Sequence, residues 1–125
     1  MTTDASKKKE FKLRVYKFVL RLLKFLNAVP NNIVIIEIKK QCVRSGCSVG
    51  ANYFESEAAI SRKDYQNFFH ISLKSANETK FWLAVIRDSG FCPKQQLPEL
   101  EWLLNELIEI ANILAASLIT MKKNN

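Results

Sequence analysis

The segment QCVRSGCSVGANYFE, residues 41–55, lies where a helical pattern should run without interruption, yet it contains two glycines and several other small residues. On a helix, Cys42, Gly46 and Gly50 would share one narrow ridge, because residues four positions apart lie on the same face. Each glycine costs a helix about 1 kcal/mol relative to alanine. Close packing of a neighbouring helix along the ridge would offset that cost. The segment therefore predicts a tightly packed helical protein, and the charges of Arg44 and Glu55 exclude a lipid setting for it.

Apolar residues recur at helical spacing over four segments, which we predict as helices over about 7–28, 31–60, 61–89 and 98–121. The chain has only 3 Gly and 3 Pro, too few to form the many turns of an all-β fold. The expected boundary residues are Pro30 after the first helix, Asn31 or Asn32 and then Ser61 as N-caps, Asp64 in a capping-box position, Gly90 as a stop, and Pro98 or Glu99 at the last start.

The predicted fold class is all-α, an antiparallel up-down-up-down four-helix bundle, because short connections make consecutive helices antiparallel neighbours. A length of 125 residues suits one domain with one core. We expect a single domain over residues 1–125, with frayed tails at 1–6 and 122–125.

The fourth predicted helix carries two parallel apolar ridges, more than one bundle seam needs. The first ridge consists of Leu100, Leu103, Leu107, Ile110, Leu114 and Met121, and the second of Leu104, Ile108, Ala111, Ala115 and Leu118. Phe81, Trp82 and Trp102 add further large apolar area. Because a small domain rarely leaves such a surface in water, we expect a homo-oligomer. The alternative is that both ridges are buried inside one protomer.

The formal net charge of +7 is concentrated at the start of the chain, where residues 1–30 hold eight Lys and Arg against Asp4 and Glu10. A basic ridge is expected along the first helix, formed by Arg14, Lys17, Arg21 and Lys24 and preceded by Lys7, Lys8 and Lys9. Such a ridge suits contacts to the phosphates of RNA or DNA. The alternative is a solvated basic face that only keeps the protein from aggregating.

A membrane span or a signal peptide is not expected. The segment KLRVYKFVLRLLKFL, residues 12–26, carries a charge every three or four positions, unlike the apolar region of a signal peptide. Three cysteines are an odd number and argue against a disulfide framework. We expect a cytoplasmic protein with reduced thiols and no membrane partner.

A polar ridge runs beside the small-residue ridge of the second helix, and the third helix carries serines and Glu78 at matching spacing. We expect these two helices to pack closely, with Arg44 or Asn52 pairing with a partly buried Glu78. The expected structural network comprises Arg44, Ser48, Asn52, Glu55 and Glu78. Breaking a buried pair of this kind would cost about 3–5 kcal/mol. The alternative is a solvated polar face.

No catalytic residue, metal site or cofactor is predicted, so we do not expect an enzyme. His70, the only histidine, lies among Phe68, Phe69 and Ile71, where a packing or surface role is the simpler interpretation. Cys42 and Cys47 are about 140° apart around a helix and do not share a face as a two-cysteine metal clamp would. A site combining these cysteines with His70 and Cys92 is the weakest alternative.

Two runs of the chain, residues 41–68 and 73–91, resemble the bacterial four-helix-bundle family of 23S rRNA intervening-sequence proteins. Typical members read Q-x-x-R-[SA]-x-x-S-[IV]-x-x-N-[IV]-x-E, then S-R-K-[DE]-[FY], then S-x-x-E-[TL]-x-[YF]-W-L. The matching residues are Gln41, Arg44, Ser45, Ser48, Val49, Asn52 and Glu55, then Ser61, Arg62, Lys63, Asp64 and Tyr65, then Ser75, Glu78, Thr79, Phe81, Trp82 and Leu83. The chain departs from the pattern at Tyr53 and at Ser56-Glu57, near the expected end of the second helix.

The resemblance implies architecture more than activity. Relatives form homopentameric barrels of four-helix bundles, so a ring-like homo-oligomer is expected. The chain is also similar to the accessory proteins of diversity-generating retroelements, basic pentamers that bind nucleic acid and assist a reverse transcriptase. The leading hypothesis is a non-enzymatic oligomeric scaffold that binds RNA or DNA through the basic ridge. The alternative is a protein-interaction hub for a partner such as a reverse transcriptase, with no direct nucleic-acid role.

Overall fold

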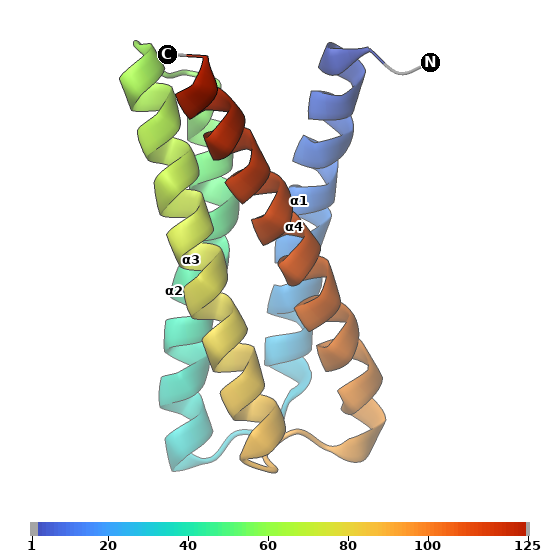
Figure 1. The fold of residues 1–125 in the computed structure, drawn as a ribbon. Helices are drawn as coiled ribbons and strands as arrows, with labels where there is room; N and C mark the ends of the chain where they lie inside the picture. Colours follow the sequence, from blue (N-terminus) through green and yellow to red (C-terminus); the bar gives the residue numbers. More distant parts are fainter. Residues whose placement is uncertain (1–2, 125) are drawn as a thin grey trace.

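Four long helices form an all-α bundle in a computed structural model that describes residues 3–124 (Figure 1). They are α1 (Asp4–Ala28), α2 (Ile33–Ser56), α3 (Arg62–Asp88) and α4 (Leu97–Lys123), with a single 3-10 turn, η1 (Lys94–Gln96), before α4. Consecutive helices run antiparallel, and α1 contacts both α2 and α4, while α3 contacts both α2 and α4. The predicted up-down-up-down four-helix bundle is confirmed.

Local sequence signals set the helix boundaries. The Asn32 side chain accepts hydrogen bonds from the backbone N–H groups of Val34 and Ile35, and so caps α2. Ser61 Oγ accepts from Asp64 N at 3.0 Å and caps α3. Gly90 follows the end of α3 with a φ of +79°, a conformation that favours glycine. The predicted caps and stop are therefore confirmed.

The two ends of the chain are more helical than expected. Helix α1 already begins at Asp4, because Thr3 caps it by accepting a hydrogen bond from Ser6 N at 3.0 Å. Helix α4 continues to Lys123. Residues 4–6 and 122–123 of the expected tails, 1–6 and 122–125, are therefore helical, while residues 1, 2 and 125 lie outside the described part of the chain.

Both apolar ridges of α4 face the inside of the protomer. The first is fully buried from Leu100 to Leu114, and in the second Leu104, Ala111 and Leu118 are no more than 7% exposed. Only Ile108 of the second ridge is substantially exposed, at 44%. The double ridge is thus explained by the core of one protomer and does not itself supply a surface for self-association.

The segment Lys94–Lys123 is long and apolar enough to cross a bilayer by length and composition, since its most apolar 18-residue window has a mean hydropathy of 1.5. A core helix meets the same criteria, and the buried leucines of α4 belong to the same hydrophobic core cluster as Phe18 and Leu22 of α1. We therefore interpret α4 as the core helix of the bundle.

The glycine ridge of α2 packs against α1. A Cβ atom added to Gly46 would overlap Leu22 Cδ2 of α1, and one added to Gly50 would lie 3.0 Å from Val19 Cγ2 of the same helix. Close approach of a neighbouring helix is therefore the correct reason for the glycines. Sequence spacing predicts the ridge but does not define which helix it meets.

Candidate nucleic-acid interface

The two arginines of the predicted basic ridge point toward α4 and pair with its carboxylates. Arg14 donates to Glu106 through Nε at 2.8 Å and Nη2 at 2.7 Å, and Nη2 lies 3.1 Å from an oxygen of Glu109. Hydrogen bonding to Glu106 raises the pKa of Arg14 above its ordinary value, so its charge is permanent. Arg14 therefore fastens α1 to α4.

Arg21 makes the equivalent contact one heptad further along α1. Its Nε donates to Glu99 at 3.0 Å, and its guanidinium lies over the ring of Trp102, 3.3 Å from the centroid. Hydrogen bonding to Glu99 raises the pKa of Arg21. Glu99 and Glu106 are also seven residues apart, so the matching spacing of the two arginines and the two glutamates is a sequence signal for their antiparallel pairing. The prediction of a continuous basic ridge overlooked this signal.

The lysines of the predicted interface are, by contrast, exposed and unpaired. Lys7, Lys8, Lys9, Lys17 and Lys24 are all exposed, and none forms an ion pair with a carboxylate within residues 3–124. The phosphate-binding capacity of α1 therefore lies with these lysines rather than with its two arginines.

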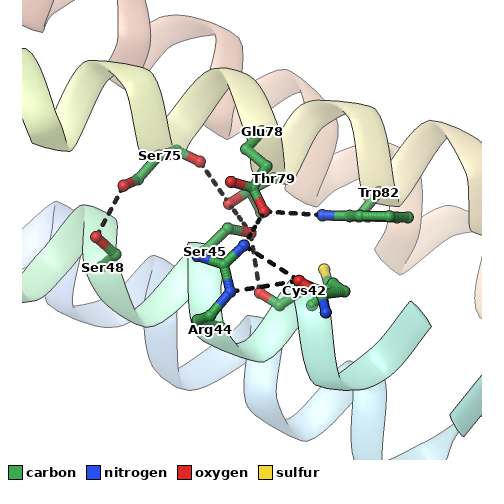
Figure 2. A network of polar contacts seen from close by, with 9 residues as sticks. Cys42, Arg44, Ser45, Ser48, Ser75, Glu78, Thr79 and Trp82 are labelled. Atoms are coloured by element: carbon green, nitrogen blue, oxygen red, sulfur yellow. Dashed lines mark hydrogen bonds and ion pairs between the residues drawn. The ribbon is translucent and has the colours of Figure 1, made fainter. Parts of the chain in front are cut away.

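The predicted polar network between α2 and α3 is centred on Glu78 (Figure 2). Arg44 Nη2 donates to Glu78 Oε2 at 2.5 Å, and Trp82 Nε1 donates to the same oxygen at 3.0 Å. The pairing of Arg44 with a partly buried Glu78 agrees with the prediction. The Arg44 side chain is 61% exposed and that of Glu78 is 35% exposed, so the pair lies at the edge of the seam.

The interior of the same seam is held by hydroxyl groups. Thr79 Oγ1 donates to Ser45 Oγ at 2.8 Å, and Ser72 Oγ donates to the carbonyl of Val49 at 2.7 Å. Ser75 and Ser48 are also bonded through their hydroxyls, at 2.8 Å (Figure 2). These short side chains let α2 and α3 approach closely while each of these hydroxyls has a partner.

Two predicted members of the network have different roles. Asn52 donates to the backbone carbonyl and the hydroxyl of Ser48, both at 2.9 Å, and does not reach Glu78. Glu55 is exposed, and its side chain makes no hydrogen bond within residues 3–124. It is not part of the network, because it lies near the end of α2 on the side where α1 and α2 form a shallow groove.

The cysteines and the histidine are spread over the bundle. Cys42 is fully buried, and burial raises the pKa of its thiol to about 12. Cys92 is buried after α3, Cys47 is partly exposed, and His70 is exposed on α3. No group of three or more His, Cys, Asp or Glu side chains in the described residues is placed to hold a metal ion. The absence of an enzymatic activity stays a prediction.

Comparison with known proteins identifies relatives over nearly the whole chain. A family described as 23S rRNA-intervening sequence protein matches residues 7–115. A crystal structure of a protein of unknown function from Bacteroides thetaiotaomicron VPI-5482, assigned to the S23 ribosomal protein family, is 32% identical, with a TM-score of 0.78. The alignment covers 90% of this chain and 97% of that one. No curated protein matches.

The polar seam between α2 and α3 contains six of the residues that carry the resemblance to this family. Arg44, Ser45, Ser48, Ser75, Glu78 and Thr79 all belong to that seam. The match over residues 7–115, together with this geometry, identifies the chain as a member of the 23S rRNA-intervening sequence protein family.

Proposed function

We propose that this protein is a non-enzymatic scaffold that binds the phosphate backbone of nucleic acid through the lysines of α1 and presents several copies of that surface by self-association. The observation that carries the proposal is the division of charge on α1. Arg14 and Arg21 are neutralised by carboxylates of α4, whereas the lysines at 7, 8, 9, 17 and 24 face solvent without a carboxylate partner in the described residues.

Phosphate contacts explain why such a surface needs no defined pocket. Lysine is a flexible point charge that contacts phosphates without reading sequence, and each contact releases counterions from the nucleic acid. Binding is therefore expected to weaken steeply with salt. The family description names 23S rRNA, so RNA is the first probe to use.

Self-association would multiply weak contacts, and the structure offers a surface for it. Leu13, Tyr16 and Leu20 form an apolar strip on α1 and are 52%, 50% and 49% exposed. The strip continues onto α2 at Phe54, whose ring centroid lies 6.0 Å from that of Tyr16. We propose this α1–α2 strip, rather than α4, as the contact between copies. In a ring-like oligomer the lysine surface of α1 would then repeat and gain avidity.

The proposal is tested by measuring RNA affinity against salt for a variant in which Lys9, Lys17 and Lys24 become Gln. If each lysine contacts one phosphate, the slope of log affinity against log salt falls by about 0.7–0.9 per lysine, or roughly 2–3 in total. Affinity at low salt should fall for every RNA sequence tested.

A charge-matched control replaces Lys63, Lys74 and Lys94, three exposed lysines outside α1, by Gln. This control lowers the net charge equally and should leave the slope nearly unchanged. If the two variants lose affinity to the same extent, net charge rather than the α1 surface governs binding, and the proposed interface is wrong.

A further inference from the structure

The bundle is open at the end that carries both termini. Figure 1 shows the N-terminal end of α1 standing apart from the C-terminal end of α4, which leans toward α3. A cleft of about 610 Å³ lies at this end, lined by residues of all four helices. The space is bordered by Phe11 and Ile113 and reaches Met121 near the end of α4.

Aromatic rings form much of the wall of this cleft. Tyr53 lies 4.9 Å from Phe11 and 5.6 Å from Phe69 between ring centroids, and Tyr65 lies 4.9 Å from Phe69. All four rings line the cleft. Every nucleobase has a flat apolar face, so a wall of aromatic side chains suits base stacking without selecting a sequence.

Two tyrosine hydroxyls in the cleft have no protein partner. Neither Tyr53 nor Tyr65 donates or accepts a side-chain hydrogen bond within residues 3–124, and neither oxygen is among the fully enclosed polar atoms. Burial raises the pKa of Tyr53 to about 12, so its hydroxyl keeps its proton at neutral pH. Both hydroxyls are therefore available to the polar edge of a ligand.

Lysines surround the cleft and continue past it. Lys7 and Lys8 line it together with Asp4. A second depression of about 750 Å³ shares Lys8, Tyr53 and Tyr65 with the first and is also lined by Lys9. Lys12 lines it too but is paired with Glu57 at 3.0 Å. Lys7, Lys8 and Lys9, which are unpaired within residues 3–124, thus extend from one depression to the next, which fits a polyanion with phosphates at regular intervals better than a single anionic head group.

We infer that this cleft, at the open end of the bundle, binds an unstacked base of single-stranded nucleic acid, with the neighbouring phosphates on the lysines at its rim. The inference rests on the proposed function, since it assigns a preference for single-stranded over duplex nucleic acid to the same basic helix. It adds that the protein distinguishes a flexible single strand from a duplex, whose bases are already paired and stacked.

The test compares three RNA probes of equal length by fluorescence anisotropy: a single-stranded oligouridylate, an abasic oligomer with the same phosphates, and a duplex. A stacked base should make the single strand bind at least about fivefold more tightly than the abasic oligomer. Tyr65→Ala should remove this preference and leave affinity for the abasic oligomer unchanged. Tyr65→Phe, which keeps the ring, should retain the preference, as should Phe81→Ala, which removes an exposed ring outside the cleft.

Equal affinities for the single strand and the abasic oligomer would overturn the cleft assignment while leaving the phosphate-binding proposal intact. Absence of salt-sensitive binding to all three probes would refute the proposed function itself. A second measurement avoids dependence on variant folding: 5-iodouridine in the oligomer should crosslink to Phe11, Tyr53 or Tyr65 in the unaltered protein. Crosslinks confined to Tyr16 or Phe54, which do not line the cleft, would overturn the inference.

Discussion

At the scale of single residues, the contact between α1 and α2 depends on a missing side chain. Gly46 lies directly against Leu22, which is fully buried, and the same glycine is near the methyl group of Thr79 on α3. Gly46 therefore limits how closely both α1 and α3 approach α2. Gly50 faces the same helix but meets only Val19 and Val15, at 3.0 and 3.9 Å from a hypothetical Cβ.

We predict that Gly46→Ala destabilises the protein by up to about 2 kcal/mol, because overpacking a core costs about 1–3 kcal/mol and the helix gains about 1 kcal/mol from alanine. Urea denaturation measures the change in the free energy of unfolding. Gly50→Ala is the matched control and should be close to neutral, since Val19 is only partly buried and needs to move by a few tenths of an ångström. Equal losses for the two variants would show that Leu22 is not the obstacle.

At the scale of helices, the seam between α2 and α3 separates an exposed ionic edge from a buried hydroxyl interior. Glu78 retains contact with water, and its pairing with Arg44 is screened. Thr79 is fully buried and bonds both Ser45 Oγ and the carbonyl of Ser75, each at 2.8 Å. The hydroxyl groups, rather than the ion pair, should therefore dominate the stability of this seam.

We predict that Glu78→Gln costs no more than about 1 kcal/mol, as expected for an exposed pair, whereas Thr79→Val costs about 1–2 kcal/mol because two buried hydrogen bonds are lost. Thr120→Val is the control for the substitution itself. Thr120 bonds the carbonyl of Ala116 within α4 but is exposed, so its loss should have little effect. Thermal or chemical unfolding ranks the three variants, and a larger loss for Glu78→Gln than for Thr79→Val would show that the ion pair dominates the seam instead.

The sequence was sufficient to predict the helices, and less informative about how they meet. Asn32, Ser61 and Gly90 act within a few residues of chain, so their effects can be read locally. The helix that the glycine ridge meets depends on the rotation of each helix about its axis, which spacing does not define. The pairing of Arg14 and Arg21 with α4 was recoverable in principle, since the two arginines and their glutamates share a seven-residue spacing.

At the scale of the whole molecule, charge and apolar surface share the solvent-facing side of α1. The side toward α4 is neutralised by ion pairs. Lys9, Lys17 and Lys24 lie within one helical turn of Leu13 or Leu20, and Lys9 lines the same surface depression as Leu13 and Tyr16. Burying the apolar strip between copies would therefore place these lysines at the border of the contact, whereas Lys7 and Lys8 line the cleft at the end of the bundle. Self-association and nucleic-acid binding thus draw on neighbouring parts of a single helix.

We predict that the protein sediments at micromolar concentration as a species several times heavier than the 14.4 kDa chain. Leu13→Gln combined with Leu20→Gln should reduce it to monomer, because an amide placed in an apolar contact would lose its hydration without gaining a partner, and the charge of α1 is unchanged. The matched control, Ile71→Gln with Ile119→Gln, places the same amides at exposed apolar positions on α3 and α4 and should leave the assembly intact. Since avidity depends on the number of linked copies, the monomeric variant should also bind RNA more weakly even though the lysines at 7, 8, 9, 17 and 24 are unchanged. If the unaltered protein sediments as a monomer, the α1–α2 strip is not an interface between copies. The RNA affinity measured for that protein would then be the affinity of a single chain, without avidity.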